Sequence, residues 1–186
     1  WGMVDDPRAT AVFDFIECAN FARVPDDAVN LREEYGVAEG TPLVGYFGRF
    51  TKAKGVHLLL RALGKLRREG VRFHALLVGP IDDAGRDEGV KGKVKRFLGR
   101  APHADVVRGL VQREGLEECV TFTGPQSRVE AWVPQCDVLA APFTEPHFSR
   151  LCAEAAAAGR PAVAFDIDGP GEEIIDGKSG LLAEPF

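Results

Sequence analysis

The sequence has few of the features that mark disulfide-rich, membrane-spanning and broadly anion-binding proteins. Only four of its 186 residues are cysteine, and no two form a CxxC pair. This argues against a disulfide framework or a zinc site and predicts reduced, mostly buried thiols of a cytoplasmic protein. No apolar run approaches the ~18 residues that span a bilayer, and no signal-peptide pattern opens the chain. The formal net charge of −5 gives no general attraction for nucleic acid or anionic membranes.

The composition is that of a globular protein, and the length fits one domain with an N-terminal arm. We expect residues 1–40 to be an arm or interdomain linker with a short helix, and residues 41–186 to be an α/β domain. Apolar and polar residues alternate across Val12–Ile16, which fits a short strand or extended segment. A capping box at Asn30–Glu33 predicts the short helix, and Gly36 would close it. Because the chain starts on Trp1 and stops after a strand-like LLA, we expect it to be a piece of a longer protein.

Strand-like and helix-like segments alternate along the chain. Continuous apolar runs predict strands at 43–48, 72–78, 120–123, 137–141 and 161–165, and helical patterns occur at 55–69, 105–114, 127–133 and 150–158. Between residues 81 and 103 charge and glycine replace this pattern, which predicts a mobile insertion, partly helical around Lys93–Leu98. The alternation predicts a parallel sheet with helices on both faces. In such open sheets ligands bind where the strands end, so the loops 48–55, 79 onward and 142–149 should converge.

The loop GRFTKAKG, residues 48–55, carries Arg49, Lys52 and Lys54 directly after the first strand. Cations at a strand end would neutralise a diphosphate, arginine through a bidentate fork and lysine as a point charge. Taken alone, the loop also fits a solvated basic turn.

The helix at 150–158 has Ser149 as its expected N-cap and Gly159 at its C-terminal end. Its N-terminus should point at the loop 144–148, and free N–H groups and the helix dipole favour an anion there. A small alanine-rich helix that merely packs on the sheet is the alternative.

Two glutamates flank this helix start. Glu154 on the helix could accept hydrogen bonds from two ribose hydroxyls, and Glu145 in the loop could meet a sugar hydroxyl. The pair also fits a two-carboxylate hydrolase, and a glutamate in an alanine-rich helix can simply be solvated. His147, between them, could act as a general base or an anion donor, or could hydrogen-bond a neighbouring backbone group.

Two further motifs resemble known ligand sites but depart from their patterns. Residues 171–179, GEEIIDGKS, resemble a Walker-type phosphate loop, but the spacing between glycines is wrong and no long helix follows. Asp166 and Asp168 resemble a DxD metal site, yet Gly169 and Gly171 fit a close backbone turn better, and no further ligand is recognisable nearby.

Several of these motifs together resemble a known family. GRFTKAKG, VTFTG, CDVLAAP, AEAAAAGRPAVA and DGPGEEIIDGKSGLL occur in the order seen in the C-terminal, donor-binding domain of retaining GT-B glycosyltransferases of family 4. The resemblance covers nearly all of residues 43–186. It implies that residues 41–186 are a truncated, Rossmann-like nucleotide-sugar-binding domain whose acceptor domain is absent.

The resemblance also implies roles for individual residues. Arg49 and Lys54 match the basic pair that binds the donor diphosphate, and Glu154 matches the ribose-binding glutamate. Glu145 matches the glutamate that contacts the transferred sugar if His147 is an insertion, because the spacing is E-x8-E where the family has E-x7-E. Arg49, Lys54 and Glu145 are therefore the expected catalytic residues. The expected donor-binding residues are Gly48, Gly79, Phe122, Gly124, His147, Phe148, Ser149, Arg150, Leu151 and Glu154.

The function implied is transfer of a hexose from UDP- or GDP-sugar with retained anomeric configuration, without a metal or other cofactor. The acceptor, a carbohydrate, lipid or small molecule, would bind in the missing N-terminal domain, and any membrane association would come from that part. Nucleic acid is not an expected partner. The altered glutamate spacing leaves open a non-catalytic module that binds a nucleotide-sugar or a partner, and the fold also admits an epimerase or a hydrolase.

Overall fold

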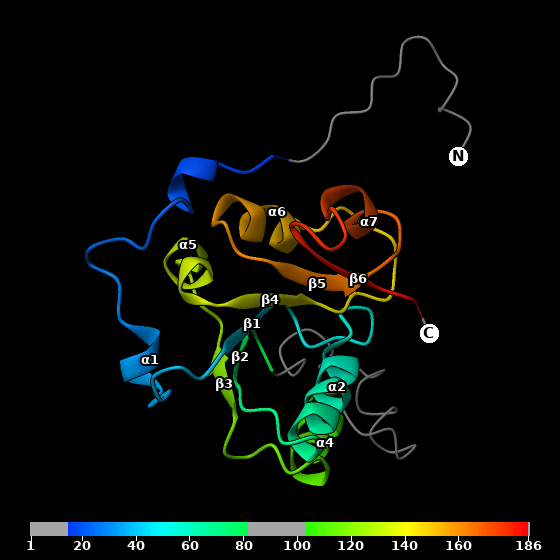
Figure 1. Cartoon of the computed structure of the whole chain (residues 1–186). Coiled ribbons are helices and arrows are strands. Elements are labelled where there is room, and N and C mark those ends of the chain that lie inside the picture. Colours follow the sequence, from blue (N-terminus) through cyan, green and yellow to red (C-terminus); the bar gives the residue numbers. More distant parts are fainter. Residues whose placement is uncertain (1–14, 82–102, 186) are drawn as a thin grey trace, which may run out of the picture.

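A single parallel sheet forms the centre of the computed structural model, which describes residues 15–81 and 103–185 (Figure 1). Its strands are β1 (Leu43–Phe47), β2 (His74–Val78), β3 (Val120–Gly124), β4 (Val138–Ala141), β5 (Ala162–Phe165) and β6 (Gly180–Ala183). They lie in the order β3-β2-β1-β4-β5-β6, and every pair is parallel. After β3, at one edge, the chain crosses to β4 beside β1. The order therefore reverses between β1 and β4, where open α/β sheets bind ligands.

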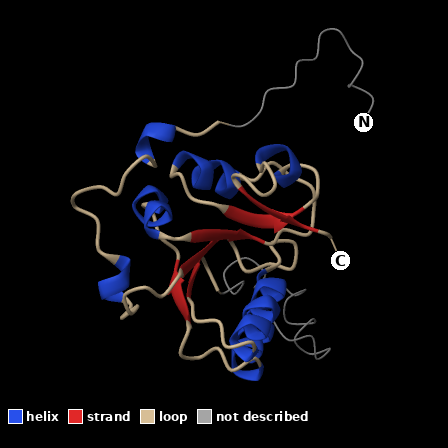
Figure 2. Ribbon diagram, in the orientation of Figure 1, coloured by secondary structure: helices blue, strands red, loops and turns tan. Residues whose placement is uncertain are grey.

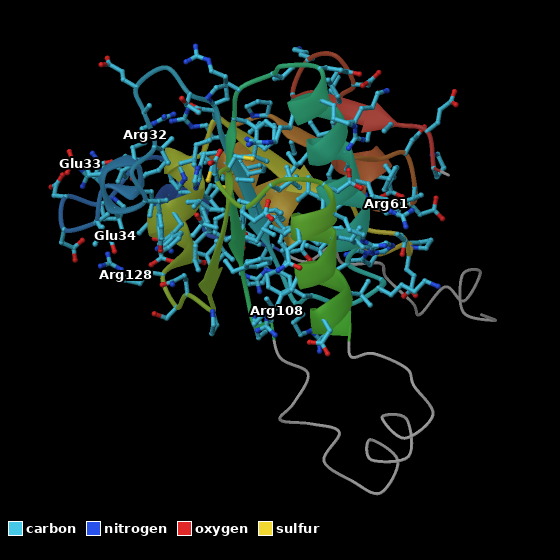
Figure 3. All side chains as sticks on the ribbon, turned by 90° about the horizontal axis from the view of Figure 1, so that it is seen from below. Arg32, Glu33, Glu34, Arg61, Arg108 and Arg128 are labelled. Atoms are coloured by element: carbon cyan, nitrogen blue, oxygen red, sulfur yellow. The ribbon has the colours of Figure 1, made fainter. Side chains whose placement is uncertain are left out.

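Helices cover both faces of the sheet, which confirms the predicted fold class (Figure 2). The helices are η1 (Cys18–Asn20), α1 (Leu31–Glu34), α2 (Val56–Arg68), α4 (His103–Arg113), α5 (Val129–Trp132), η3 (Val133–Gln135), α6 (Arg150–Ala157) and α7 (Pro170–Glu173). On one face α2 and α4 pack over β1, β2 and β3, whereas α6 and η3 pack over β4 and β5 on the other. Arg61 on α2 and Arg108 on α4 are exposed on the outer side of their helices (Figure 3).

The helix α2 forms because its apolar residues recur at helical spacing. Val56, Leu59, Leu60 and Leu63 are all buried against the sheet, while the last turn carries basic side chains that suit a helix C-terminus. The predicted helix at 55–69 is thus confirmed to within one residue at each end.

The segment before β1 packs on the same body. The Asn30 side chain accepts hydrogen bonds from the Arg32 and Glu33 amides, as the capping box predicts. Leu31 is buried with Leu43, and the Arg32 guanidinium contacts the Asp137 carboxylate at 2.5 Å. Residues from the start of α1 onward are therefore anchored to the sheet.

The structure departs from the sequence-based predictions in a few places. The close backbone turn expected at Gly169 is present, since a Cβ there would lie 1.8 Å from the His147 carbonyl oxygen, but the unexpected short helix α7 begins directly after it, at Pro170. The helix expected at 127–133 is a single α-helical turn continued by the 3-10 turn η3. Residues 15–17, at the end of the expected strand around Val12–Ile16, are not in a strand, and the rest of that segment and the helix expected around Lys93–Leu98 lie outside the described residues. No helix in the described part of the chain is long and apolar enough to cross a bilayer.

Candidate donor-binding site

A cavity of about 440 Å³ opens where the strands end, on both sides of the β1–β4 boundary. Its wall is built from the ends of β1 and β2, the turn after β3, the loop after β4 and the first turns of α5 and α6. The lining residues are Phe47, Gly48, Arg49, Lys54, Val78, Gly79, Pro80, Pro125, Gln126, Val129, Phe143, His147, Phe148, Arg150, Leu151 and Glu154.

Two glycines allow the loops around the cavity to approach one another. A Cβ on Gly79, whose φ is +148°, would lie 2.0 Å from the carbonyl oxygen of Gly48, so the ends of β1 and β2 meet only without a side chain there. A Cβ on Gly55, whose φ is +67°, would lie 1.6 Å from the carbonyl oxygen of Pro142. The loop 48–55 therefore lies directly against the loop after β4.

Tyr46 and Phe50 fix the loop 48–55 from the core side. The Tyr46 hydroxyl donates a hydrogen bond to the Arg49 carbonyl oxygen at 2.9 Å and lies 3.5 Å from that of Lys54. Phe50 is 2% exposed and stacks on the Tyr46 ring with a centroid distance of 5.7 Å. Burial of Tyr46 raises the pKa of its hydroxyl, so that group stays protonated and remains a donor. The backbone that carries the two cations is therefore held at both of their carbonyl groups.

Lys54 reaches across the cavity to the loop after β4. Its ammonium nitrogen lies 3.0 Å from Nε2 of His147 and 4.3 Å from the centre of the Phe143 ring. The other ring nitrogen of His147, Nδ1, lies 2.8 Å from the carbonyl oxygen of Glu145. Since a carbonyl oxygen only accepts, Nδ1 carries the proton, and Nε2 of the neutral ring accepts from Lys54. His147 thus links Lys54 to the backbone of the loop.

The cavity has a cationic end. Burial is the main cause that lowers the pKa of Lys54, and the nearby positive charge of Arg49 lowers it further, whereas the Glu145 carboxylate raises it. Arg49 itself is exposed at the rim of the cavity. Two cations close enough to repel each other, with one partly desolvated, favour an anion of high charge between them.

The start of α6 forms the opposite wall. Ser149 is the N-cap, and its Oγ accepts a hydrogen bond from the Cys152 amide at 3.3 Å, as predicted. Glu154, one turn further on, is only 8% exposed yet lines the cavity. Burial raises the pKa of Glu154 and the Arg150 guanidinium, 3.7 Å away, lowers it. A largely desolvated carboxylate of this kind is a strong acceptor for hydroxyl donors.

The structure brings together most of the residues expected from the sequence. Arg49, Lys54 and Glu154 share one cavity, and so do Gly48, Gly79, His147, Phe148, Arg150 and Leu151. The remaining four lie elsewhere. Glu145 is exposed outside the lining, and Ser149 is buried behind it. Phe122 packs edge-on against Phe50 in the core, and the Gly124 carbonyl oxygen accepts from the Gly79 amide at 3.0 Å.

Some lining residues were not expected from the sequence. Pro125 and Gln126 directly follow β3, so the rule that parallel strands end at the ligand side would have found them. Phe143 follows β4 and lies in the loop that the same rule points to, but its place beneath the Lys54 ammonium depends on contacts between two loops.

No group of three or more His, Cys, Asp or Glu side chains within residues 15–81 and 103–185 is arranged to hold a metal ion. Asp166, from the DxD-like pair, instead lies so close to Gly171 that a Cβ there would be 2.9 Å from its Oδ1. Metal independence stays a prediction.

Comparison with known proteins identifies the family. A family model described as glycosyl transferases group 1 matches residues 27–186. The chain belongs to this family. Among curated relatives of this group 1 glycosyltransferase chain, the D-inositol 3-phosphate glycosyltransferases of Nocardia farcinica and Corynebacterium jeikeium are 30% and 28% identical over 162 and 157 residues. These alignments cover 85% and 82% of the chain but 33% and 34% of the relatives, so the chain spans about a third of their length.

Solved structures of glycosyltransferases have the same fold as this chain. HepE of Anabaena in complex with UDP-glucose matches at 29% identity with a TM-score of 0.70, over 91% of this chain and 42% of that one. Sucrose-phosphate synthase of Thermosynechococcus elongatus matches at 26% identity with a TM-score of 0.71, over 91% and 38%. A C-terminal domain of a group 1 glycosyltransferase from Francisella tularensis, 21% identical, shares the fold with a TM-score of 0.63 over 92% of this chain and 80% of its own. The described residues therefore have the fold of the C-terminal domain of a GT-B glycosyltransferase.

Proposed function

We propose that this chain is the donor-binding part of a retaining, metal-independent hexosyltransferase of the family 4 kind, and that its donor is UDP-glucose or a closely related nucleotide-sugar. The observation that carries the proposal is the shared cavity of Arg49, Lys54 and Glu154 at the switch point of the sheet. The relative HepE, whose structure contains UDP-glucose, supports the choice of uridine nucleotide.

The diphosphate would lie between the two cations and the start of α6. Arg49 can form paired hydrogen bonds to phosphate oxygens, and Lys54 can exchange its contact with His147 for a phosphate oxygen. The ribose would lie against Glu154, whose carboxylate can accept from both ribose hydroxyls. Donor binding therefore replaces the internal contact of Lys54 with a contact to the ligand.

During transfer, the bond between the anomeric carbon and the diphosphate oxygen would break, and its electron pair would stay on the diphosphate. An acceptor hydroxyl would form the new bond on the same face of the sugar, and its proton would pass to the departing diphosphate. The cations that bind the ground state become more important as the negative charge on the leaving group grows, which is how electrostatic stabilisation lowers a barrier. We place the acceptor in a part of the protein outside this chain.

The test is calorimetric titration of the 186-residue chain with UDP, GDP, UDP-glucose and GDP-mannose. We expect saturable binding of the uridine compounds, weakened by about tenfold or more in Arg49→Ala and in Lys54→Ala, since each removes a charged hydrogen bond worth about 1.5–3 kcal/mol.

The matched control is Lys52→Ala, which removes the same charge from an exposed side chain of the same loop that does not line the cavity. It should change the affinity by less than about twofold at moderate salt. No saturable binding, or equal weakening in all three variants, would contradict the proposal.

A second candidate is a nucleotide-sugar-binding module without transferase activity. It is favoured by the position of Glu145, which matches the sugar-contacting glutamate of the family but is exposed outside the cavity lining. Transfer of labelled sugar by the full-length protein would exclude this candidate. Donor binding without any transfer would support it.

A further inference from the structure

Glu173, at the end of α7, contacts the backbone at the start of α6. Its Oε1 accepts a hydrogen bond from the Ser149 amide at 3.0 Å. The neighbours of Ser149 on both sides, Phe148 and Arg150, line the cavity, whereas Ser149 is 1% exposed and lies behind it. Glu173 therefore holds the wall of the cavity from the side opposite to the ligand.

The carboxyl group of Glu173 is poorly compensated as an anion. Its Oε2 is buried and accepts no hydrogen bond among the described residues apart from a weak contact with the neighbouring Cys152 thiol. Burial raises the pKa of Glu173 to about 7, the Ser149 amide and the neighbouring Cys152 thiol lower it, and Glu172 on the same helix raises it. Two more acids, Asp166 and Asp168, lie on the turn before α7, and no side-chain cation forms an ion pair with Glu173 within the described ranges. Near neutral pH the group is therefore divided between its charged and neutral forms.

Building on the donor-binding function proposed above, we propose that Glu173 is a positioning residue of this site, which holds the Ser149 peptide and takes up a proton when a diphosphate binds in front of α6. A diphosphate places two negative charges on the other side of one peptide unit, and like charges favour the neutral form of a carboxyl group. Protonation removes that repulsion, and the carbonyl oxygen of the neutral acid still accepts from the Ser149 amide.

Donor affinity should fall as the pH rises through the pKa of Glu173, because the bound form holds more protons than the free form. If binding raises that pKa by one unit, the affinity weakens about sevenfold between about pH 6 and pH 8.5, and each binding event takes up about half a proton near pH 7.5.

UDP-glucose is the appropriate probe, because its diphosphate is esterified on both sides and keeps both charges over this range. Binding to the 186-residue chain is measured by calorimetry at pH 7.5 in two buffers of different ionisation enthalpy, which gives the number of protons exchanged. We expect net uptake in the wild-type chain and about half a proton less in Glu173→Gln, whose amide oxygen still accepts from Ser149. Any change in the protonation of Lys54 contributes to both proteins, so the difference between them is the readout.

Glu184→Gln is the matched control, since it makes the same change at an exposed position, and it should exchange as many protons as the wild type. Should Glu173→Gln not fold, the carboxyl carbon of Glu173 in the wild type is titrated by NMR, and its midpoint should rise when UDP-glucose is added. Equal proton exchange in wild type and Glu173→Gln, or an unmoved midpoint, overturns this inference alone. Absence of UDP-glucose binding at every pH overturns the proposed function as well.

Discussion

At the scale of single residues, the candidate site depends on side chains that hold the backbone behind the ligand-facing groups. Tyr46 holds the carbonyl group of Arg49, and His147 holds the ammonium group of Lys54. In each case the residue that would touch the diphosphate is placed by a neutral donor or acceptor. The Tyr46 contact restricts the loop before the ligand binds and so lowers the entropic cost of binding, whereas the Lys54–His147 contact is exchanged for one with the ligand.

Tyr46→Phe tests this arrangement. The variant keeps the buried ring but removes the hydroxyl that donates to the Arg49 carbonyl oxygen. We expect the free energy of unfolding to fall by about 1 kcal/mol and the affinity for UDP-glucose to fall severalfold, measured by chemical denaturation and calorimetry.

The chain offers a matched control for this variant in its second tyrosine, Tyr35, which packs against Trp132 with a centroid distance of 6.0 Å, away from the cavity lining. Tyr35→Phe should leave the affinity unchanged. If both variants bind UDP-glucose like the wild type, the Tyr46 hydroxyl has no part in placing Arg49.

At the scale of elements, α6 combines a stabilising N-cap with a ligand-facing first turn. Its N-cap oxygen, Ser149 Oγ, accepts from the Cys152 amide, and its first residue, Arg150, lines the cavity. Stability of the helix start and affinity for the donor should therefore change together.

Ser149→Ala removes this cap and should lower the free energy of unfolding by about 1 kcal/mol and weaken UDP-glucose binding. The comparison is Asn30→Ala, which removes the cap of α1, where the Asn30 side chain accepts from the Arg32 and Glu33 amides. Asn30→Ala should lower the stability without changing the affinity. The same measurements, denaturation and titration, apply to both, and an unaltered affinity in Ser149→Ala would separate the helix start from donor binding.

The central strands β1, β2 and β4 could be predicted from the sequence because both faces of the sheet are covered there, so each strand is a largely apolar run. The helix α7 could not, since Pro170 is flanked by Gly169 and Gly171, and glycine is a poor helix former. The positions of Arg49 and Lys54 followed from the rule that ligands bind where parallel strands end. Glu154 was expected as a carboxylate on the helix aimed at the site and from the family resemblance. The burial of Glu173 against α6 depends on how two helices pack, which no local pattern encodes.

The position of Glu145 likewise depends on contacts that no local sequence pattern encodes. The sequence showed the altered E-x8-E spacing, and the match of Glu145 to the family glutamate required His147 to be an insertion. The hydrogen bond that His147 was expected to make to a neighbouring backbone group is present, to the Glu145 carbonyl oxygen. The sequence did not indicate that the other ring nitrogen would contact Lys54. The role of Glu145 in sugar transfer stays a prediction.

At the scale of the whole molecule, the sheet order explains why these groups meet. The crossover from β3 to β4 places the loops after β1 and β4 side by side, and one loop supplies cations while the other leads into α6. The chain spans about a third of the length of its curated relatives, and we propose that its own part in sugar transfer is to bind the donor.

The most direct test of the central claim is a crystal structure of this chain with UDP-glucose. We expect the diphosphate between the Arg49 guanidinium and the Lys54 ammonium, both within about 3 Å of phosphate oxygens, with the ribose hydroxyls on Glu154. A nucleotide bound elsewhere, or a diphosphate that contacts neither cation, would contradict the account.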